Sequence, residues 1–145
     1  MNNTRFFLGI DSGGTNCRIS ACGLDLNIIN SVVYPSVHYS TAGCEDFSSH
    51  TAANINLFLE QFNLSLKDCL GICVGVAGAR AANNKEEIKN SLADTLKFEK
   101  IIIESDTVIA FVDAHGENDG LILICGTGSV LFGRIDGEIV RLGGW

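Results

Sequence analysis

Three residues of this sequence could carry phosphoryl-transfer chemistry, and each stands beside small residues. Asp11 precedes the glycine turn at residues 12–16, Asp106 follows an isoleucine-rich run, and Thr127 lies between two glycines. Glycine lets backbone N–H groups approach an anion closely, and neighbouring hydroxyl groups add further donors. A carboxylate can hold a Mg²⁺-bound water or accept the proton of an attacking hydroxyl group. These residue types therefore indicate a site that binds a polyphosphate and transfers a phosphoryl group.

Each of these features also has a purely structural explanation. Asp11 could stabilise a turn, and Asp106 could cap a helix, as its neighbour Ser105 could. The glycines could simply form tight hairpin turns. A single glycine turn would be a weak indication of phosphate binding. Two such turns, at matched places in an internal repeat, favour phosphate binding over the hairpin explanation.

The three histidines carry less weight. His38 follows the third expected strand, where a loop histidine could contact a ligand or could simply be exposed. His50 and His115 are predicted at surface positions of helices. Only His38 is therefore a candidate for the site.

The elements that must position these residues begin with a predicted meander of three strands. Apolar and β-branched residues concentrate in residues 5–11, 17–23 and 28–34, with only a few residues between the runs. Strands joined by such short connections must pair antiparallel. The turn after Asp11 is then the first turn of this meander.

Helices and strands alternate in the next segment. An amphipathic helix precedes a buried strand over residues 70–76, and a second helix is expected to begin at Asn84, with a capping box completed by Glu87. A strand over residues 101–104 and a short helix ending at Gly116 follow. This alternation predicts parallel pairing through right-handed crossovers. The helical side chains expected to face the core are Phe47, Thr51, Ile55, Phe58, Phe62, Ile88, Leu92, Leu96, Val108, Phe111 and Val112.

The opening pattern then returns near the end of the chain. Residues 121–125, 130–135 and 138–142 predict a second meander, with a glycine turn at 126–129 and an Asp136-Gly137 hairpin turn. We interpret this as an internal repeat whose second copy comprises only its opening meander. The sequence therefore predicts an α/β fold with a mixed sheet, formed by an antiparallel meander and parallel strands with flanking helices. We expect a first lobe over residues 1–117 and the start of a second lobe over residues 118–145.

Composition excludes several classes of protein. The chain has 145 residues, a formal net charge of −7 and 46% hydrophobic residues, which is too apolar for a disordered tail. It has no apolar run of the roughly 20 residues that a membrane helix needs, no signal-peptide pattern and no basic patch for nucleic acid. Its six cysteines lack metal-site spacing and fit a reducing compartment. We therefore expect a cytoplasmic protein that binds neither membranes nor nucleic acid.

Five motifs occur in an order that resembles one protein family. Together they look like the BadF/BadG/BcrA/BcrD ATPase family, and within it the N-acetylglucosamine and glucosamine kinases. That family belongs to the superfamily of actin-like ATPases, sugar kinases and Hsp70, whose duplicated lobes are ribonuclease H-like. The resemblance covers nearly the whole chain and is specific as a set. The motifs are Ile10-Asp11-Ser12-Gly13-Gly14-Thr15-Asn16, Val76-Ala77-Gly78, Glu104-Ser105-Asp106, Gly126-Thr127-Gly128-Ser129 and Gly143-Gly144-Trp145.

The resemblance implies transfer of the γ-phosphoryl group of ATP to the 6-hydroxyl group of an amino sugar, with Mg²⁺. It implies that Asp106 is the catalytic base and contacts the sugar, that Asp11 holds Mg²⁺ through water, and that Gly78 and Gly144 line the sugar pocket. The family commonly has a sugar-contacting Asn after the third strand, and His38 or Val37 takes that place here. The residues implied in ATP and phosphate binding are Asp11, Gly13, Gly14, Thr15, Asn16, Gly126, Thr127, Gly128 and Ser129.

Two other functions stay open at this point. ATPases of the same family that activate 2-hydroxyacyl-CoA dehydratases or benzoyl-CoA reductases carry cluster cysteines just beyond the strand that ends near Gly78, and residues 79–100 contain none. Alternatively, the chain is a non-catalytic nucleotide-binding or interaction fragment. The family continues past Trp145 into a full second lobe, so we expect an N-terminal portion that is inactive alone. Its apolar second meander should pack on the first lobe or on another chain, which favours a homodimer.

Overall fold

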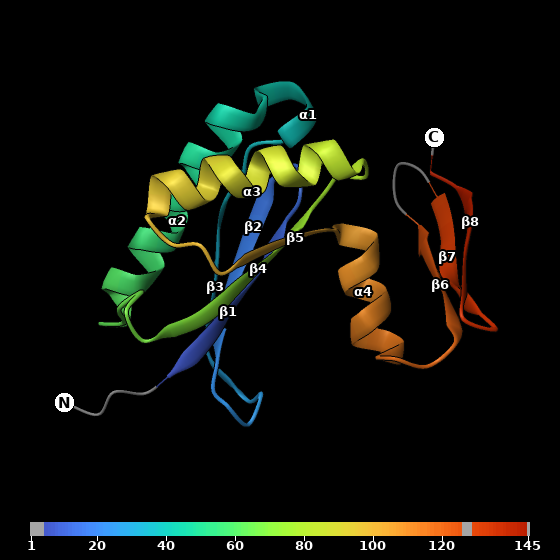
Figure 1. The fold of residues 1–145 in the computed structure, drawn as a ribbon, viewed down its shortest axis with the longest axis horizontal. Coiled ribbons are helices and arrows are strands. Elements are labelled where there is room, and N and C mark those ends of the chain that lie inside the picture. The colour runs from blue at the N-terminus through green and yellow to red at the C-terminus, as the bar shows by residue number, and fades with distance from the viewer. Residues whose placement is uncertain (1–4, 126–128, 145) are drawn as a thin grey trace. The chain divides into compact units, whose positions relative to one another are not determined.

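The computed structural model describes residues 5–125 and 129–144, which form two compact units (Figure 1). The first unit ends at Ser105 and the second begins at Asp106. Helix α4 (Asp106–His115) thus groups with the C-terminal strands, whereas the predicted lobe boundary lies after residue 117. The assignment of residues to the two lobes of a repeat stays a prediction. Each unit is described below by itself.

The first unit contains a mixed five-stranded sheet with the order β3-β2-β1-β4-β5. Strand β2 (Asn16–Cys22) pairs antiparallel with β1 (Phe6–Ser12) and β3 (Ile28–Pro35). Strand β4 (Cys69–Val76) pairs parallel with β1 and with β5 (Ile101–Ser105). The meander and the parallel strands predicted from the sequence are both confirmed.

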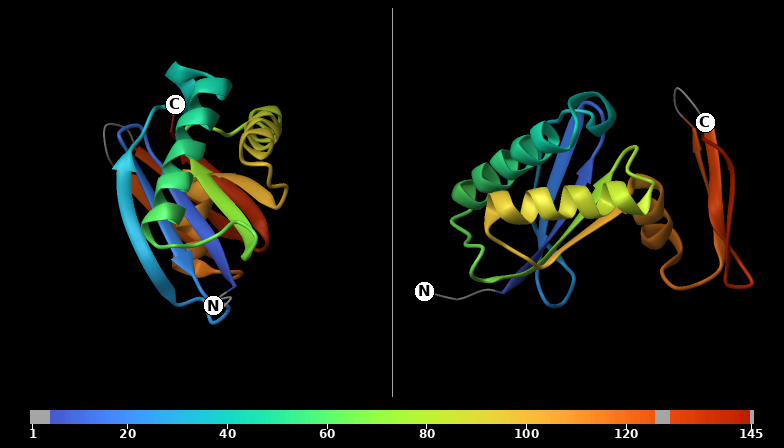
Figure 2. Two further views of the ribbon diagram at one scale, coloured as in Figure 1. Left: turned by 90° about the vertical axis from the view of Figure 1, so that its left-hand side faces the viewer. Right: turned by 45° about the horizontal axis from the view of Figure 1, so that its top comes forward.

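Two helices cover one face of this sheet (Figures 1 and 2). Residues on this face of β1 and β2 alternate with exposed ones, and Leu8, Ile10 and Ile19 are at most 3% exposed. Helices α2 (Cys44–Gln61) and α3 (Ala82–Leu96) bury their apolar side chains in the same core. The predicted stripes are confirmed for the buried residues Phe47, Thr51, Ile55, Phe58, Ile88, Leu92 and Leu96.

One predicted helix start is wrong. Helix α3 begins at Ala82 after Ala81, which makes no side-chain capping bond, so Asn84 already lies inside the helix and cannot cap it. The first backbone hydrogen bond of the helix runs from the Lys85 N–H to the Ala81 carbonyl at 3.2 Å. The sequence also gave no sign of the four-residue helix α1 (Tyr39–Ala42), which is too short to show a helical period.

The second unit is a small antiparallel sheet with helix α4. Strands β6 (Gly120–Cys125), β7 (Ser129–Ile135) and β8 (Glu138–Gly143) pair in that order, as predicted. Phe111 of α4 packs against Val130 and Phe132 to form its core. Val112, which was predicted to face the core, is 54% exposed. Of the predicted stripe, Phe111 and Val108 contact this core, and Val112 lies outside it.

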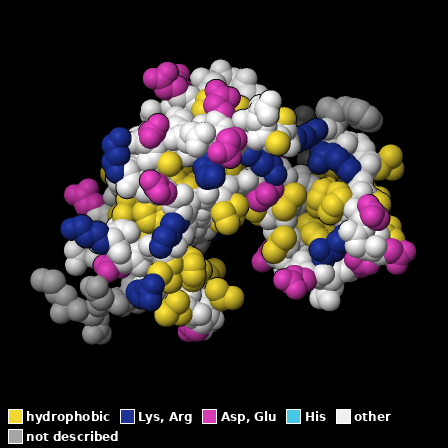
Figure 3. Space-filling model, in the orientation of Figure 1, with side chains coloured by type: hydrophobic (Ala, Val, Ile, Leu, Met, Phe, Trp, Pro, Cys, Tyr) yellow, Lys and Arg dark blue, Asp and Glu magenta, His cyan; other side chains and the backbone are white. Residues whose placement is uncertain are grey.

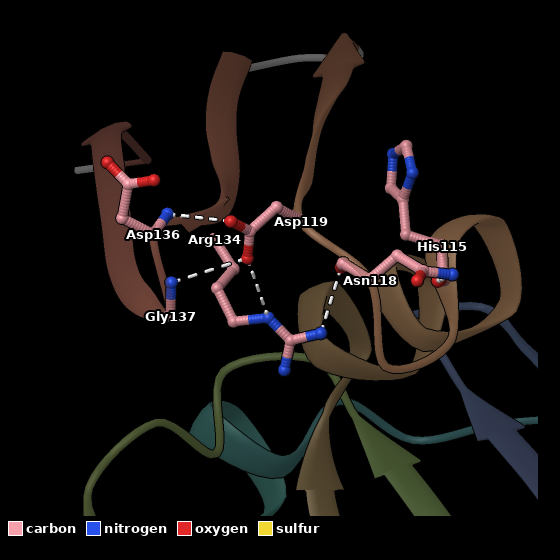
Figure 4. Close-up of polar contacts among 6 residues, drawn as sticks. All are labelled: His115, Asn118, Asp119, Arg134, Asp136 and Gly137. Carbon is pink, nitrogen blue, oxygen red and sulfur yellow. Dashed lines mark hydrogen bonds and ion pairs between the residues drawn. The ribbon is translucent and has the colours of Figure 1, made fainter.

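Asp119 organises the polar end of the second unit (Figure 4). Its carboxylate accepts the Asp136 N–H at 2.7 Å and pairs with Arg134 at 3.3 Å. Arg134 also donates to the Asn118 carbonyl at 2.8 Å and lies over the Phe111 ring. Asp136 and Gly137 both have positive φ, as the predicted Asp-Gly hairpin turn requires. The connection before β6 is therefore tied to the β7–β8 turn.

Apolar side chains gather at the surface of both units (Figure 3). At the tip of the β2–β3 hairpin, Leu24 and Leu26 are 66% and 73% exposed. In the second unit, the pairing of β6, β7 and β8 places six large apolar residues on one sheet face, here called the leucine face: Leu121, Leu123, Leu131, Ile135, Val140 and Leu142. Within the described residues, no helix is both long enough and apolar enough to span a membrane.

Candidate functional site

The candidate site lies at the edge of the first sheet where four strands end. Because β2 is antiparallel to both of its neighbours, β1, β3, β4 and β5 run in the same direction. Their carboxyl ends therefore meet at one edge, where ligands commonly bind in α/β sheets. The glycine turn, the connection after β3 and the connection after β4 all begin there.

The glycine turn after β1 combines a hairpin with a candidate phosphate loop. The Gly13 N–H donates to the Asn16 carbonyl at 2.9 Å, so this group is used to close the turn. The hairpin explanation is therefore correct for Gly13. Gly14 and Thr15 lie at the exposed tip and are the turn residues whose backbone can face an anion.

Both neighbouring connections hold the glycine turn in place. The Ser36 N–H donates to the Thr15 carbonyl at 2.9 Å, and the Ala77 N–H donates to the Ser12 carbonyl at 3.1 Å. The hydroxyl groups of Ser12 and Ser36 also lie 3.1 Å apart, and Ser12 is only 2% exposed. The shape of the turn is therefore fixed by the protein itself, which lowers the ordering cost of binding.

His38 lies between two of the predicted glycines. A Cβ atom at Gly14 would come within 3.0 Å of the His38 Cδ2, and one at Gly78 within 3.6 Å of its Cε1. Gly78 has a φ of +89°, which disfavours any other residue there. Gly14, His38 and Gly78 were predicted from three separate segments, and the structure brings them together.

Asp11 lies one residue before the end of β1, in a row of residues across the other sheet face. The pairing places it beside Arg18 of β2 and Gly75 of β4, and Gly75 beside Glu104 of β5. The Asp11 side chain is exposed. Glu104 forms an ion pair with Lys85 of α3. Arg18 and Lys85 could not be placed in this row from the sequence, because strand register and a helix-to-strand contact decide their positions.

Asp106 follows β5 directly and is the first residue of α4. Its Oδ1 accepts the Thr107 N–H at 2.8 Å and lies 3.3 Å from the Thr107 hydroxyl group, which donates to it. A conventional helix cap accepts an N–H two or three residues further along the chain. These contacts instead hold one carboxylate oxygen against the next residue, and Oδ2 takes no part in them.

The second glycine turn falls mostly outside the described residues, which resume at Ser129. Gly126, Thr127 and Gly128 are among the residues not described, so their predicted role in binding ATP stays a prediction. Ser129 is exposed, and its carbonyl accepts the Gly144 N–H at 2.9 Å. Two predicted site residues of the second unit are therefore neighbours.

The cysteines show no sign of metal chemistry among residues 5–125 and 129–144. All six are free thiols, and no group of three or more His, Cys, Asp or Glu side chains in these ranges is arranged to hold a metal ion. Burial raises the pKa of the Cys17, Cys69 and Cys73 thiols, which keeps them protonated. Cys17 and Cys69 behave as small apolar residues of the core.

The described residues have the fold of a class of proteins that includes sugar kinases. A candidate N-acetylglucosamine kinase from Chromobacterium violaceum superimposes with a TM-score of 0.77, at 22% identity, over 99% of this chain and 50% of its own. A ROK family glucokinase from Streptomyces griseus gives a TM-score of 0.65 at 16% identity, over 93% and 46%. Within this class, the chain belongs to the BadF/BadG/BcrA/BcrD ATPase family, whose sequence model matches residues 8–145.

Curated relatives of the chain are sugar kinases. It is 30% identical over 142 residues to the N-acetylmuramic acid/N-acetylglucosamine kinase of Clostridium acetobutylicum, covering 97% of this chain and 46% of that protein. It is 26% identical over 153 residues to the N-acetyl-D-glucosamine kinase of Dictyostelium discoideum, with 96% and 47% coverage. The chain thus spans about half the length of the curated relatives it matches.

Proposed function

We propose that the chain is the N-terminal portion of an ATP-dependent kinase for an amino sugar such as N-acetylglucosamine or glucosamine. The kinase transfers the γ-phosphoryl group to the 6-hydroxyl group of the sugar. One observation carries this proposal: Gly14, His38 and Gly78 lie together at the sheet edge where β1, β4 and β5 end. The names of the curated relatives support an amino sugar as the substrate.

The glycine turn of the first unit binds the phosphates of ATP. Gly14 and Thr15 present backbone N–H groups and a hydroxyl group at the turn tip, while the bonds from Ser36 and Ala77 keep the turn rigid. Donors fixed in advance stabilise charge without reorganising during the reaction. Gly13 and Asn16 shape the turn, and Gly126, Thr127, Gly128 and Ser129 form the second phosphate loop.

Asp11 suits Mg²⁺, because an exposed carboxylate is the hard oxygen ligand that this ion takes, directly or through water. The residues paired with Asp11 are Gly75 of β4, which has no side chain, and Arg18 of β2. Mg²⁺ bound with ATP neutralises charge that develops on the phosphates. In this proposal Asp11 holds a water of the ion and thereby orients the nucleotide.

Asp106 is the catalytic base. Its carboxylate accepts the proton of the sugar 6-hydroxyl group while the oxygen forms a bond to the γ-phosphorus. The bond from the γ-phosphorus to the bridging oxygen breaks, and ADP leaves with that oxygen. The Thr107 N–H keeps Oδ1 in place, so the carboxylate cannot rotate freely. Gly78, His38 and Gly144 line the sugar pocket.

Residues 1–145 have no appreciable kinase activity alone, because two lobes must close to exclude water and position the reactants. The separate chain forms a homodimer through the leucine face, on which Leu123 and Leu142 are 65% and 71% exposed. The protein is cytoplasmic and has no nucleic acid or membrane partner.

The test is phosphoryl transfer by a fusion of residues 1–145 to the second half of the C. acetobutylicum kinase, called here the fusion enzyme. We expect ADP release with N-acetylglucosamine or glucosamine and Mg-ATP, with the phosphate on the 6-hydroxyl group by NMR. The 6-deoxy sugar should give no turnover, and residues 1–145 alone serve as the inactive control. A folded fusion enzyme without turnover, or a product phosphorylated at another position, contradicts the proposal.

The two other functions give different results with residues 1–145. An activator ATPase, when purified without oxygen, should show the visible absorbance of an iron–sulfur cluster, whereas a kinase fragment should be colourless. An interaction fragment should give no heat when ATP and Mg²⁺ are titrated by calorimetry. We expect a colourless chain that binds Mg-ATP.

A further inference from the structure

Ser40, which belongs to none of the sequence motifs, holds the ring of His38 from one side. The Nδ1 atom of His38 lies 3.2 Å from the backbone nitrogen of Ser40 and 2.7 Å from its hydroxyl oxygen. A backbone N–H can only donate, so Nδ1 must present its lone pair. In a neutral imidazole the proton then sits on Nε2.

The same geometry fixes the direction of the Nε2–H bond. The Cδ2 atom lies 3.0 Å from the Cβ position of Gly14, and Cε1 lies 3.6 Å from that of Gly78. Nε2 is bonded to both of these carbons, so it lies on the ring edge between the contacts with the two glycines. The donor is therefore directed between the glycine turn and the connection after β4.

We propose that Ser40 is a positioning residue, which fixes His38 in the tautomer protonated on Nε2 and makes it a neutral hydrogen-bond donor between Gly14 and Gly78. The partner is an oxygen of the substrate that can accept, such as a hydroxyl or amide carbonyl oxygen of the sugar. An ammonium group, which has only donors, is rejected at this point. The ligand's identity as a sugar rests on the proposed function, whereas the tautomer does not.

A simpler explanation is that His38 only caps helix α1, since its side chain accepts the Ser40 N–H at the cap position. The variant His38→Asn separates the two roles. Asparagine is among the strongest capping residues, so α1 keeps its cap, but no ring nitrogen reaches the two glycines. Ser40→Ala removes the hydroxyl group that contacts Nδ1, and Ser40→Thr restores one.

The first experiment is NMR of the chain with ¹⁵N-labelled histidines, which distinguishes protonated from unprotonated ring nitrogens. The His38 signals are those lost in His38→Asn. His50 and His115 provide internal references, because their Nε2 atoms lie 3.0 and 3.2 Å from carbonyl oxygens, which only accept. We expect the His38 proton on Nε2. The Nδ1 signal should move in Ser40→Ala and return in Ser40→Thr. A proton on Nδ1, or an Nδ1 signal unaffected by Ser40→Ala, overturns the proposal.

The second experiment measures sugar affinity with the fusion enzyme and N-acetylglucosamine. Loss of one neutral hydrogen bond should raise KM for the sugar about fivefold in His38→Asn, with a smaller change in kcat and in KM for ATP. Ser40→Ala should raise KM for the sugar less than His38→Asn does, and Ser40→Thr should return it to the unsubstituted value. An unchanged KM in His38→Asn overturns the substrate contact. If the unsubstituted fusion enzyme turns over no amino sugar, the proposed function fails, while the NMR result still decides the tautomer.

Discussion

The two meanders of the molecule share one design but differ in what covers them. In the first, Leu8 of β1 and Ile19 of β2 are at most 1% exposed, because α2 and α3 pack on them. In the second, Val130 and Phe132 of β7 are buried under α4, but Ile139 of β8 on the same face is 62% exposed. Leu123, on the leucine face opposite α4, is 65% exposed. Helices that follow the strands, and not the strands themselves, therefore decide how much of a meander is buried.

A backbone contact recurs in both meanders. The Ser36 N–H after β3 donates to the Thr15 carbonyl before β2, and the Gly144 N–H after β8 donates to the Ser129 carbonyl at the start of β7, both at 2.9 Å. In each meander the residue after the third strand thus holds the end of the glycine turn. In each case the bond extends the antiparallel pairing of the last two strands by one residue.

The largest expected effect is on the buried meander. Leu8→Ala should lower the free energy of unfolding of the first unit by about 2–5 kcal/mol, because a cavity remains in a packed core. Urea denaturation and hydrogen exchange of the β1–β5 amides provide the measurement. A loss below about 1 kcal/mol would mean that the core closes around the cavity or is poorly packed.

In the second meander, a substitution on the leucine face should change the oligomeric state of the chain and not its folding. Leu123→Asp places a charge on the leucine face, so we expect the dimer of residues 1–145 to become a monomer in light scattering. Leu24→Asp is the matched control, because Leu24 is 66% exposed but lies at the tip of the β2–β3 hairpin. The control should stay dimeric. A dimer that survives Leu123→Asp excludes the leucine face as its interface.

A substitution at the polar end of the second unit should cause a smaller loss in the free energy of unfolding. Asp119→Ala removes the acceptor of the Asp136 N–H and the partner of Arg134. These are charged contacts at a half-exposed group, so the loss should be about 1–2 kcal/mol. Hydrogen exchange should increase in β6–β8 and not in β1–β5. Asp113→Ala, an exposed residue of α4, is the control, and an equal effect there would contradict the role of Asp119.

The mildest test leaves folding unchanged and compares two thiols. Cys17 of the first meander is 1% exposed, and burial raises its pKa, whereas Cys125 of the second is exposed. Thiolate is the reactive form, so a raised pKa lowers the fraction of reactive Cys17 at neutral pH. Iodoacetamide should modify Cys125 first, and raising the pH should accelerate Cys17. Mass spectrometry measures the modification rate of each thiol. Equal rates for Cys17 and Cys125 at neutral pH would contradict the difference in burial.

The sequence predicted the elements well where hydrophobic periodicity or connection length decides them. Both meanders and the buried stripe of α2 are examples. It failed where a few residues decide a local start: α3 begins before Asn84, and α1 depends on a histidine cap. It proposed Gly14, His38 and Gly78 separately, but only the fold shows that they meet. The contacts of Ser40 with His38 and of Lys85 with Glu104 depend on side-chain geometry and on a distant segment, which no spacing reveals.

If this chain supplies the base of an amino-sugar kinase, replacing Asp106 should abolish catalysis and leave binding intact. Asp106→Asn in the fusion enzyme keeps size and helix geometry but removes the negative charge that accepts the sugar's proton. We expect kcat with N-acetylglucosamine and Mg-ATP to fall about 10²–10⁴-fold, with the melting temperature and nucleotide affinity nearly unchanged. If Asp106 only begins helix α4, asparagine should replace it at little cost. A stable variant that retains more than about a tenth of kcat would contradict the account.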